Sequence, residues 1–143
     1  LSTREIIKKL NLGLIEDLGF ESALVDLFEN WKRRFIGVKF EYKIDEKALN
    51  KITKQKTAHL YRIFQEALTN IAKHSNPKNI KISIKSLEVK DKIRILISND
   101  GINTDLVNQD GLGLIGIAER VDQINGNLEV IKKKLFKIII NMG

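Results

Sequence analysis

The chain has 143 residues, 43% hydrophobic and 30% charged, a composition typical of one globular domain with a substantial core. Its lack of cysteine excludes disulfides and thiolate metal sites, its two histidines argue against a zinc site, and no apolar run reaches the roughly 20 residues of a membrane span. The net charge of +7 suggests nucleic-acid binding, but the basic clusters at 32–34 and 132–134 are short and aromatic residues make up only 6%, so we expect solvated basic faces and no nucleic-acid partner.

Hydrophobic periodicity predicts helices and strands in alternation along the first half of the chain. A first helix covers about 20–35, and Gly37 stops it. The alternating stretch 38–44 predicts a strand with one buried face. A second helix runs over about 57–75 and ends before Pro77.

The second half predicts two strand pairs around one helix. The expected ranges are strands 79–89 and 92–98, a polar loop 99–110, a helix 112–124 and a closing hairpin of strands 127–133 and 135–141. Helices separated by antiparallel hairpins indicate an α/β (α+β) fold, a two-layer sandwich with a mixed sheet covered on one face.

Three glycines, Gly111, Gly113 and Gly116, have the spacing G-x-G-x-x-G. A dinucleotide-binding turn needs a buried strand directly before the first glycine, because the pyrophosphate sits where that strand turns into a helix. The residues upstream are polar and poor in β formers. A dinucleotide site is therefore the weaker interpretation, and the glycines need another explanation.

A polar row runs along the second helix beside its buried stripe. Arg62, Glu66, Asn70 and Lys73 follow one another at intervals of four, four and three residues, and His74 borders them. The plain interpretation is an exposed row with an Arg62–Glu66 ion pair worth ~0.3–0.5 kcal/mol. It leaves Asn70 unexplained, because asparagine is a mediocre helix former, whereas an amide oxygen one turn from a carboxylate suits Mg²⁺.

Two motifs in these segments resemble known sequence boxes. "QEALTNIAKHS" resembles the N-box of the histidine kinase ATPase domain, in the subgroup with the motif Q-E-A-L-x-N-x-x-K-H-A, which includes nitrate- and hexose-phosphate-responsive sensors. "GLGLIGIAER" resembles the glycine-rich G2 box of the same subgroup. The entry "LNLGLIEDLGFESAL" also resembles the run that leads into this domain, so the resemblance covers almost the whole chain.

The resemblance implies a Bergerat-type sandwich with a mixed, mostly antiparallel sheet and helices on one face. It implies that residues 1–19 are the end of a linker from a dimerisation domain and that residues 20–143 are the ATPase domain. The expected cofactors are ATP and Mg²⁺. The expected reaction transfers the γ-phosphoryl group to a histidine of the dimerisation domain, which then signals to a response regulator.

The resemblance also assigns roles to the polar row. Glu66 would act as general base or orient the attacking group, and Asn70 would coordinate Mg²⁺. Lys73 and His74 would meet phosphate oxygens. Neither His59 nor His74 would be the phosphoacceptor, since both lie inside the ATPase portion.

The glycine-rich segment would close on the phosphates of ATP. Backbone N–H groups at Gly111 and Gly113 would face the phosphates at a helix N-terminus, where the helix dipole favours anions. Leu112 and Leu114 would complete this ATP-binding segment, as lid and core residues respectively. Arg120, with its neighbour Glu119, is expected on the helix exterior.

The sequence departs from the family in two places. Asn99 stands where the family's D-x-G box has the aspartate that binds the adenine amino group, and Gly101 completes the box. The hydrogen bond to a neutral amide oxygen would be weaker than one to a carboxylate, which would lower the nucleotide affinity by on the order of 1 kcal/mol. A one-residue shift would offer Asp100 instead, and Asn-Asp-Gly is also a good turn in its own right. The last hairpin lacks the G-x-G-T signature of many relatives and has a lysine-rich turn.

Several alternatives stay open from the sequence. One is a degenerate nucleotide-binding sensor or scaffold that no longer transfers phosphate. Gyrase-like or chaperone ATPases share the E-x-x-x-N row, and a basic nucleic-acid-binding module is a third hypothesis. We expect a monomeric cytoplasmic domain of an inner-membrane sensor whose full-length form is a homodimer.

Overall fold

The computed structural model describes residues 15, 18–102 and 114–143. Most of the predicted linker 1–19 lies outside the described residues. So do most of the polar loop and three of the predicted phosphate-site residues, Gly111, Leu112 and Gly113.

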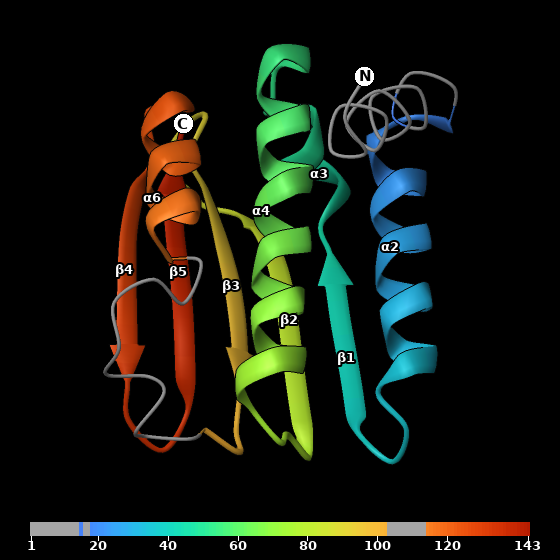
Figure 1. The fold of residues 1–143 in the computed structure, drawn as a ribbon. Coiled ribbons are helices and arrows are strands. Elements are labelled where there is room, and N and C mark those ends of the chain that lie inside the picture. Colours follow the sequence, from blue (N-terminus) through green and yellow to red (C-terminus); the bar gives the residue numbers. More distant parts are fainter. Residues whose placement is uncertain (1–14, 16–17, 103–113) are drawn as a thin grey trace, which may run out of the picture.

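The described residues form a five-stranded sheet with helices on one face (Figure 1). The elements are α2 (Phe20–Arg34), β1 (Lys39–Ile44), α3 (Glu46–Asn50), α4 (Lys54–His74), β2 (Asn79–Ser86), β3 (Ile93–Asn99), α6 (Leu114–Gln123), β4 (Asn127–Lys132) and β5 (Phe136–Met142). The strand order is β1-β2-β3-β5-β4; β1 and β2 are parallel, and the other three pairs are antiparallel. The predicted fold class, a mixed and mostly antiparallel sheet in a two-layer sandwich, is confirmed.

The core lies between the sheet and the helices α2, α4 and α6. Strand residues on one side of β2 and β3 are fully buried, because successive side chains in a strand point to opposite faces. They meet the apolar stripe of α4 that the sequence predicts, and Phe28 of α2 joins it by an edge-on ring contact to Phe64, with centroids 5.2 Å apart. The buried residues of α4 are Thr57, Leu60, Tyr61, Ile63, Phe64, Ala67, Leu68 and Ile71.

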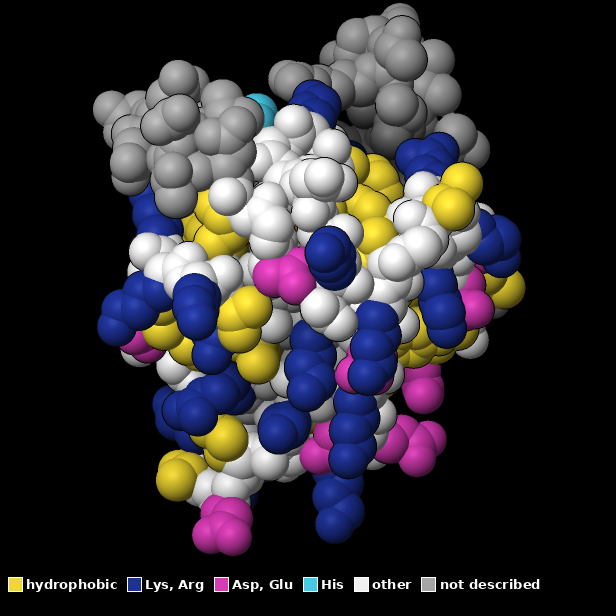
Figure 2. All heavy atoms as spheres, turned by 90° about the horizontal axis from the view of Figure 1, so that it is seen from below, with side chains coloured by type: hydrophobic (Ala, Val, Ile, Leu, Met, Phe, Trp, Pro, Cys, Tyr) yellow, Lys and Arg dark blue, Asp and Glu magenta, His cyan; other side chains and the backbone are white. Residues whose placement is uncertain are grey.

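The other face of the sheet is covered by no helix of the described part of the chain (Figure 1). Its outward residues include Lys81, Lys85 and Arg94, which alternate with buried isoleucines. Figure 2 shows Lys and Arg side chains spread over the molecule seen from below, with Asp and Glu side chains among them. No described helix has both the length and the apolar composition that a membrane crossing requires.

The observed elements differ most from the predicted ones in three places. Helix α4 begins at Lys54, three residues before its predicted start. The short helix α3 was not predicted, since five residues carry too little periodicity; it is held by Asp45, whose Oδ1 accepts a hydrogen bond from the Lys47 N–H at 3.1 Å. The strand predicted over 79–89 ends at Ser86, because the chain turns through Asp91 with a positive φ of 62°.

Candidate functional site

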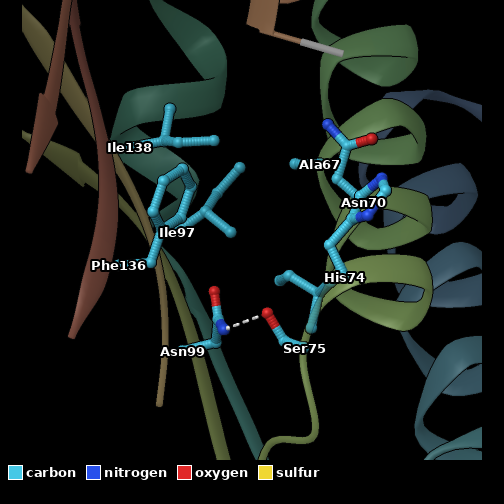
Figure 3. Close-up of a pocket in the computed structure, with 9 residues that line it drawn as sticks. Ala67, Asn70, His74, Ser75, Ile97, Asn99, Phe136 and Ile138 are labelled. Atoms are coloured by element: carbon cyan, nitrogen blue, oxygen red, sulfur yellow. Dashed lines mark hydrogen bonds between the residues drawn. The ribbon is translucent and has the colours of Figure 1, made fainter. Parts of the chain in front are cut away.

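A recess opens between the last turns of α4 and the strands β3 and β5 (Figure 3). Its apolar wall comes from side chains of both layers, and its polar groups come from the end of α4 and the end of β3. The lining residues are Ala67, Asn70, Ile71, His74, Ser75, Ile97, Asn99, Phe136 and Ile138. An apolar slot with a few converging polar groups is typical of a site for a small, largely planar ligand.

Asn99 is the last residue of β3 and has only 2% of its surface exposed. Its Nδ2 donates to Ser75 Oγ at 3.2 Å and to the carbonyl oxygen of Asp100 at 2.9 Å. These bonds fix the amide, and its oxygen points into the recess (Figure 3). The sequence-predicted residue thus offers the recess a hydrogen-bond acceptor.

Asp100 points elsewhere. Its Oδ1 accepts from the backbone N–H groups of Lys78 at 2.7 Å and Asn79 at 2.9 Å, and its Oδ2 accepts from Asn79 Nδ2 at 2.8 Å. Desolvation acts to raise the pKa of Asp100, but the hydrogen bonds from Asn79 and from nearby backbone outweigh it and hold that pKa below its ordinary value of 3.8. The one-residue shift that would make Asp100 a nucleotide ligand therefore does not fit, because this carboxylate secures the start of β2.

Gly101 ties the end of β3 to the end of α4. Its φ is 68°, and a Cβ at this position would lie 2.1 Å from the carbonyl oxygen of Asn76. Its own carbonyl oxygen accepts from the Asn76 N–H at 2.9 Å. Only glycine combines this conformation with this close approach, so Gly101 shapes the base of the recess.

Glu66 pairs with α6 and not with its helical neighbour. Its Oε1 accepts from Arg120 Nε at 3.2 Å, with 32% of the Glu66 side chain and 21% of the Arg120 side chain exposed. Arg62 instead donates to Gln65 Oε1 at 3.3 Å. The Arg62–Glu66 pair of the plain interpretation does not occur among the ion pairs of the described residues, and Arg120, expected on the helix exterior, is partly buried against α4.

The third glycine of the motif has a packing reason. A Cβ on Gly116 would lie 2.9 Å from Glu66 Oε2, and that oxygen is buried with no hydrogen-bond partner among the described residues. A side chain at this position would therefore displace Glu66. Gly116 lets the first turn of α6 come close to the polar row of α4.

The remaining predicted residues divide between the recess and its surroundings. Asn70 and His74 line it, whereas Lys73 is exposed and does not. Leu114 is half-buried and packs against the core, as predicted. Signals for Asn70 and Asn99 are readable in the sequence, and Ser75 ends the N-box-like stretch without a role assigned to it. Ile97, Phe136 and Ile138 carry no motif, and only the register of the strands brings them together.

The polar row fits a cation that takes few protein ligands. No group of three or more metal-binding carboxylates or histidines occurs within 18–102 and 114–143. The Nδ2 of Asn70 is buried and has no partner within the part of the chain that the structure describes, and rotation of the amide would present its oxygen at the same place. An amide oxygen near a carboxylate suits Mg²⁺, which keeps most of its ligands as water and phosphate oxygens.

Comparison with known proteins finds relatives among sensor histidine kinases. The chain is 26% identical to the sensor histidine kinase LiaS of Bacillus subtilis over 128 residues, which span 90% of this chain and 34% of LiaS. It is 30% identical to the sensor histidine kinase ComP of the same organism over 133 residues, which span 90% of this chain and 17% of ComP. The chain thus spans about a third of the length of one of these relatives and about a sixth of the other.

A solved structure has the same fold. The histidine kinase domain of a blue-light activated histidine kinase from Erythrobacter litoralis superposes with a TM-score of 0.69 at 14% identity, covering 86% of this chain and 60% of that one.

The sequence profile of one family, described as histidine kinase-, DNA gyrase B-, and HSP90-like ATPase, matches residues 55–141. That match takes in α4, the sheet from β2 onward and the recess between them, and the chain belongs to this ATPase family.

Proposed function

We propose that the chain is the ATP-binding catalytic domain of a sensor histidine kinase and transfers the γ-phosphoryl group of ATP to a histidine of its dimerisation domain. The observation that carries the proposal is the recess itself. It combines an apolar slot, a fixed acceptor at Asn99 and the Asn70 side chain, and Glu66 lies one turn before Asn70 on α4, against the first turn of α6. The relatives, both named sensor histidine kinases, support the same activity.

The adenine ring would occupy the apolar slot. Ile97, Phe136 and Ile138 offer it a flat apolar wall, and Asn99 Oδ1 would accept a hydrogen bond from its amino group. A neutral acceptor makes a weaker bond than a carboxylate, by roughly 1 kcal/mol. We therefore expect adenine recognition to depend more on burial of the ring than it does in relatives with aspartate here.

The phosphates would lie toward Asn70 and the first turn of α6. When bound, Mg²⁺ neutralises charge on the transferring phosphoryl group, and Asn70 is the residue that would hold it. The N-terminus of α6 favours anions, and Gly111 and Gly113 would add backbone N–H groups there. His74 and Lys73 would contact phosphate oxygens, and Glu66 would orient the attacking histidine and accept its proton.

The finer assignments belong to the same proposal. The Q-E-A-L-x-N-x-x-K-H form of the N-box favours the subgroup of nitrate- and hexose-phosphate-responsive sensors. The full-length protein would be a homodimeric membrane sensor with this domain in the cytoplasm, and it would signal to a response regulator.

Calorimetric titration of the chain with ATP, with and without Mg²⁺, tests nucleotide binding. We expect saturable binding that weakens about tenfold or more in Asn70→Asp, because a carboxylate there repels the phosphates. Asn127→Asp, an exposed change at the start of β4, is the matched control and should bind like the wild type. Absence of saturable binding at millimolar ATP would contradict the proposal.

Autophosphorylation of the protein that includes the phosphoacceptor histidine separates the kinase from the alternative, a degenerate nucleotide sensor. Asn99 in place of aspartate and the missing G-x-G-T signature favour that alternative. Labelling of a histidine N-terminal to this domain, slowed about 100-fold or more but still measurable in Glu66→Gln, would establish the kinase. ATP binding without labelling would instead support the degenerate nucleotide sensor.

A further inference from the structure

We propose that Arg120 is a positioning residue that holds the carboxylate of Glu66 in place for phosphoryl transfer. The inference rests on the proposed kinase function and deepens it. It starts from the contact between Arg120 Nε and Glu66 Oε1 at 3.2 Å, which joins α6 to α4.

α6 lies against both carboxylate oxygens of Glu66. The backbone at Gly116 is so close that an added Cβ would lie 2.9 Å from Oε2, and Arg120 binds Oε1. These two residues of α6 are four positions apart and therefore lie on the same side of the helix. One helical turn thus sets where the carboxylate can lie.

Arg120 acts from behind Glu66 and does not line the recess. Figure 1 shows α4 and α6 running in opposite directions, and the recess lies at the C-terminal end of α4. Gly116 meets Glu66 near the start of α6, and Arg120 lies one turn farther along, on the side away from Asn70. Arg120 is therefore placed to orient the base, and not to touch nucleotide.

The chemistry favours arginine for this task. The guanidinium is planar and directional, whereas a lysine ammonium is a mobile point charge. The pair is partly exposed, and such pairs contribute little to folding stability. Orientation matters far more to the reaction, since a displacement of about 1 Å at a reacting group can cost about 100-fold in rate.

The test compares Arg120→Gln with Arg94→Gln in the kinase that includes its phosphoacceptor histidine. Arg94 is a matched control, because its Nε also donates to a side-chain oxygen, Asn141 Oδ1 at 2.8 Å, on the outer face of the sheet. We expect Arg120→Gln to lower the kcat of autophosphorylation about 10- to 100-fold with the KM for ATP changed less than about threefold. Arg120→Lys should recover part of the rate, and Arg94→Gln should match the wild type.

A double-mutant cycle distinguishes positioning from a structural role. In the Glu66→Gln background, Arg120→Gln should cause no further loss of kcat, because the group it positions is already gone. An equal loss in both backgrounds, a wild-type kcat in Arg120→Gln, or a loss confined to ATP affinity would overturn the inference. A wild-type protein that binds no ATP or labels no histidine would instead overturn the proposed function, and the inference with it.

Discussion

Asn99 differs from the family's aspartate in more than the missing negative charge. The sequence predicts only that its neutral oxygen replaces a carboxylate as the adenine acceptor. The structure adds that its amide nitrogen donates to Ser75 Oγ and to the carbonyl oxygen of Asp100. A carboxylate has no hydrogen to give to that carbonyl. Asparagine at this position therefore belongs to a local bonding pattern that aspartate would break.

Asn99→Asp should consequently destabilise the chain without nucleotide. We expect a loss of about 1–3 kcal/mol at neutral pH, because a buried charge would face the Asp100 carbonyl oxygen. Urea unfolding measures this loss, with Asn127→Asp as the exposed control. Unchanged or increased stability of Asn99→Asp would show that the amide nitrogen is dispensable.

The titration of Asp100 makes the free energy of unfolding of the chain depend on pH. Its pKa is lowered in the folded state, so its stabilisation is fully present above the ordinary value of 3.8 and is lost as the pH falls through the lower folded value. Asp100→Ala should cost about 1–2 kcal/mol at neutral pH, since the bonds to Lys78 and Asn79 are partly exposed.

The two proteins should converge in stability as the pH falls below about 4, which chemical denaturation at a series of pH values measures. Asp122→Ala, an exposed change on α6, should stay within about 0.5 kcal/mol of the wild type throughout. A constant difference between wild type and Asp100→Ala down to pH 2 would contradict a titration of Asp100.

At the scale of elements, the sequence predicts the helices α4 and α6 but not the contact between them that places Glu66 and Arg120 together. The sequence predicts both helices from their apolar spacing, and their buried residues lie where expected. It does not show which faces meet, because that depends on the register between two helices joined through the sheet. Glu66 and Arg120, 54 residues apart, are the result of that register.

Gly116→Ala tests this contact at the residue of α6 that lies against Glu66 Oε2. Alanine favours a helix over glycine by up to about 1 kcal/mol, and the atom that the new Cβ meets is the mobile end of Glu66. We expect stability equal to or above that of the wild type, with autophosphorylation reduced at least about tenfold. Thermal unfolding and histidine labelling are measured on the same preparations. Unchanged stability with unchanged labelling, or loss of both stability and labelling, would contradict this prediction.

At the scale of the molecule, the sequence predicts most of the architecture. Alternating strands and amphipathic helices determine the two layers, and the polar row locates one wall of the site. The opposite wall depends on pairing between distant strands: Ile97 lies opposite Ile138, and Asn99 lies opposite Phe136. Such neighbours carry no local signal, because each strand pattern fits several partners equally well.

The charge of the whole molecule leads to a prediction about nucleic acids. Nucleic-acid binding needs cations gathered along a track, and single-strand binding also needs exposed rings on which bases stack. Here Lys and Arg are spread with Asp and Glu among them (Figure 2), and Trp31, the one tryptophan, packs against Phe35 with Arg34 above its ring.

We therefore expect only weak, sequence-independent binding of a duplex of about 20 base pairs at low salt, and none measurable at about 150 mM salt. Fluorescence anisotropy with labelled DNA and RNA measures it, and a variant with Lys81, Lys85 and Arg94 changed to Gln should bind only somewhat more weakly at low salt. A dissociation constant below about 1 μM at physiological salt would contradict this prediction, because scattered charge alone does not bind so tightly.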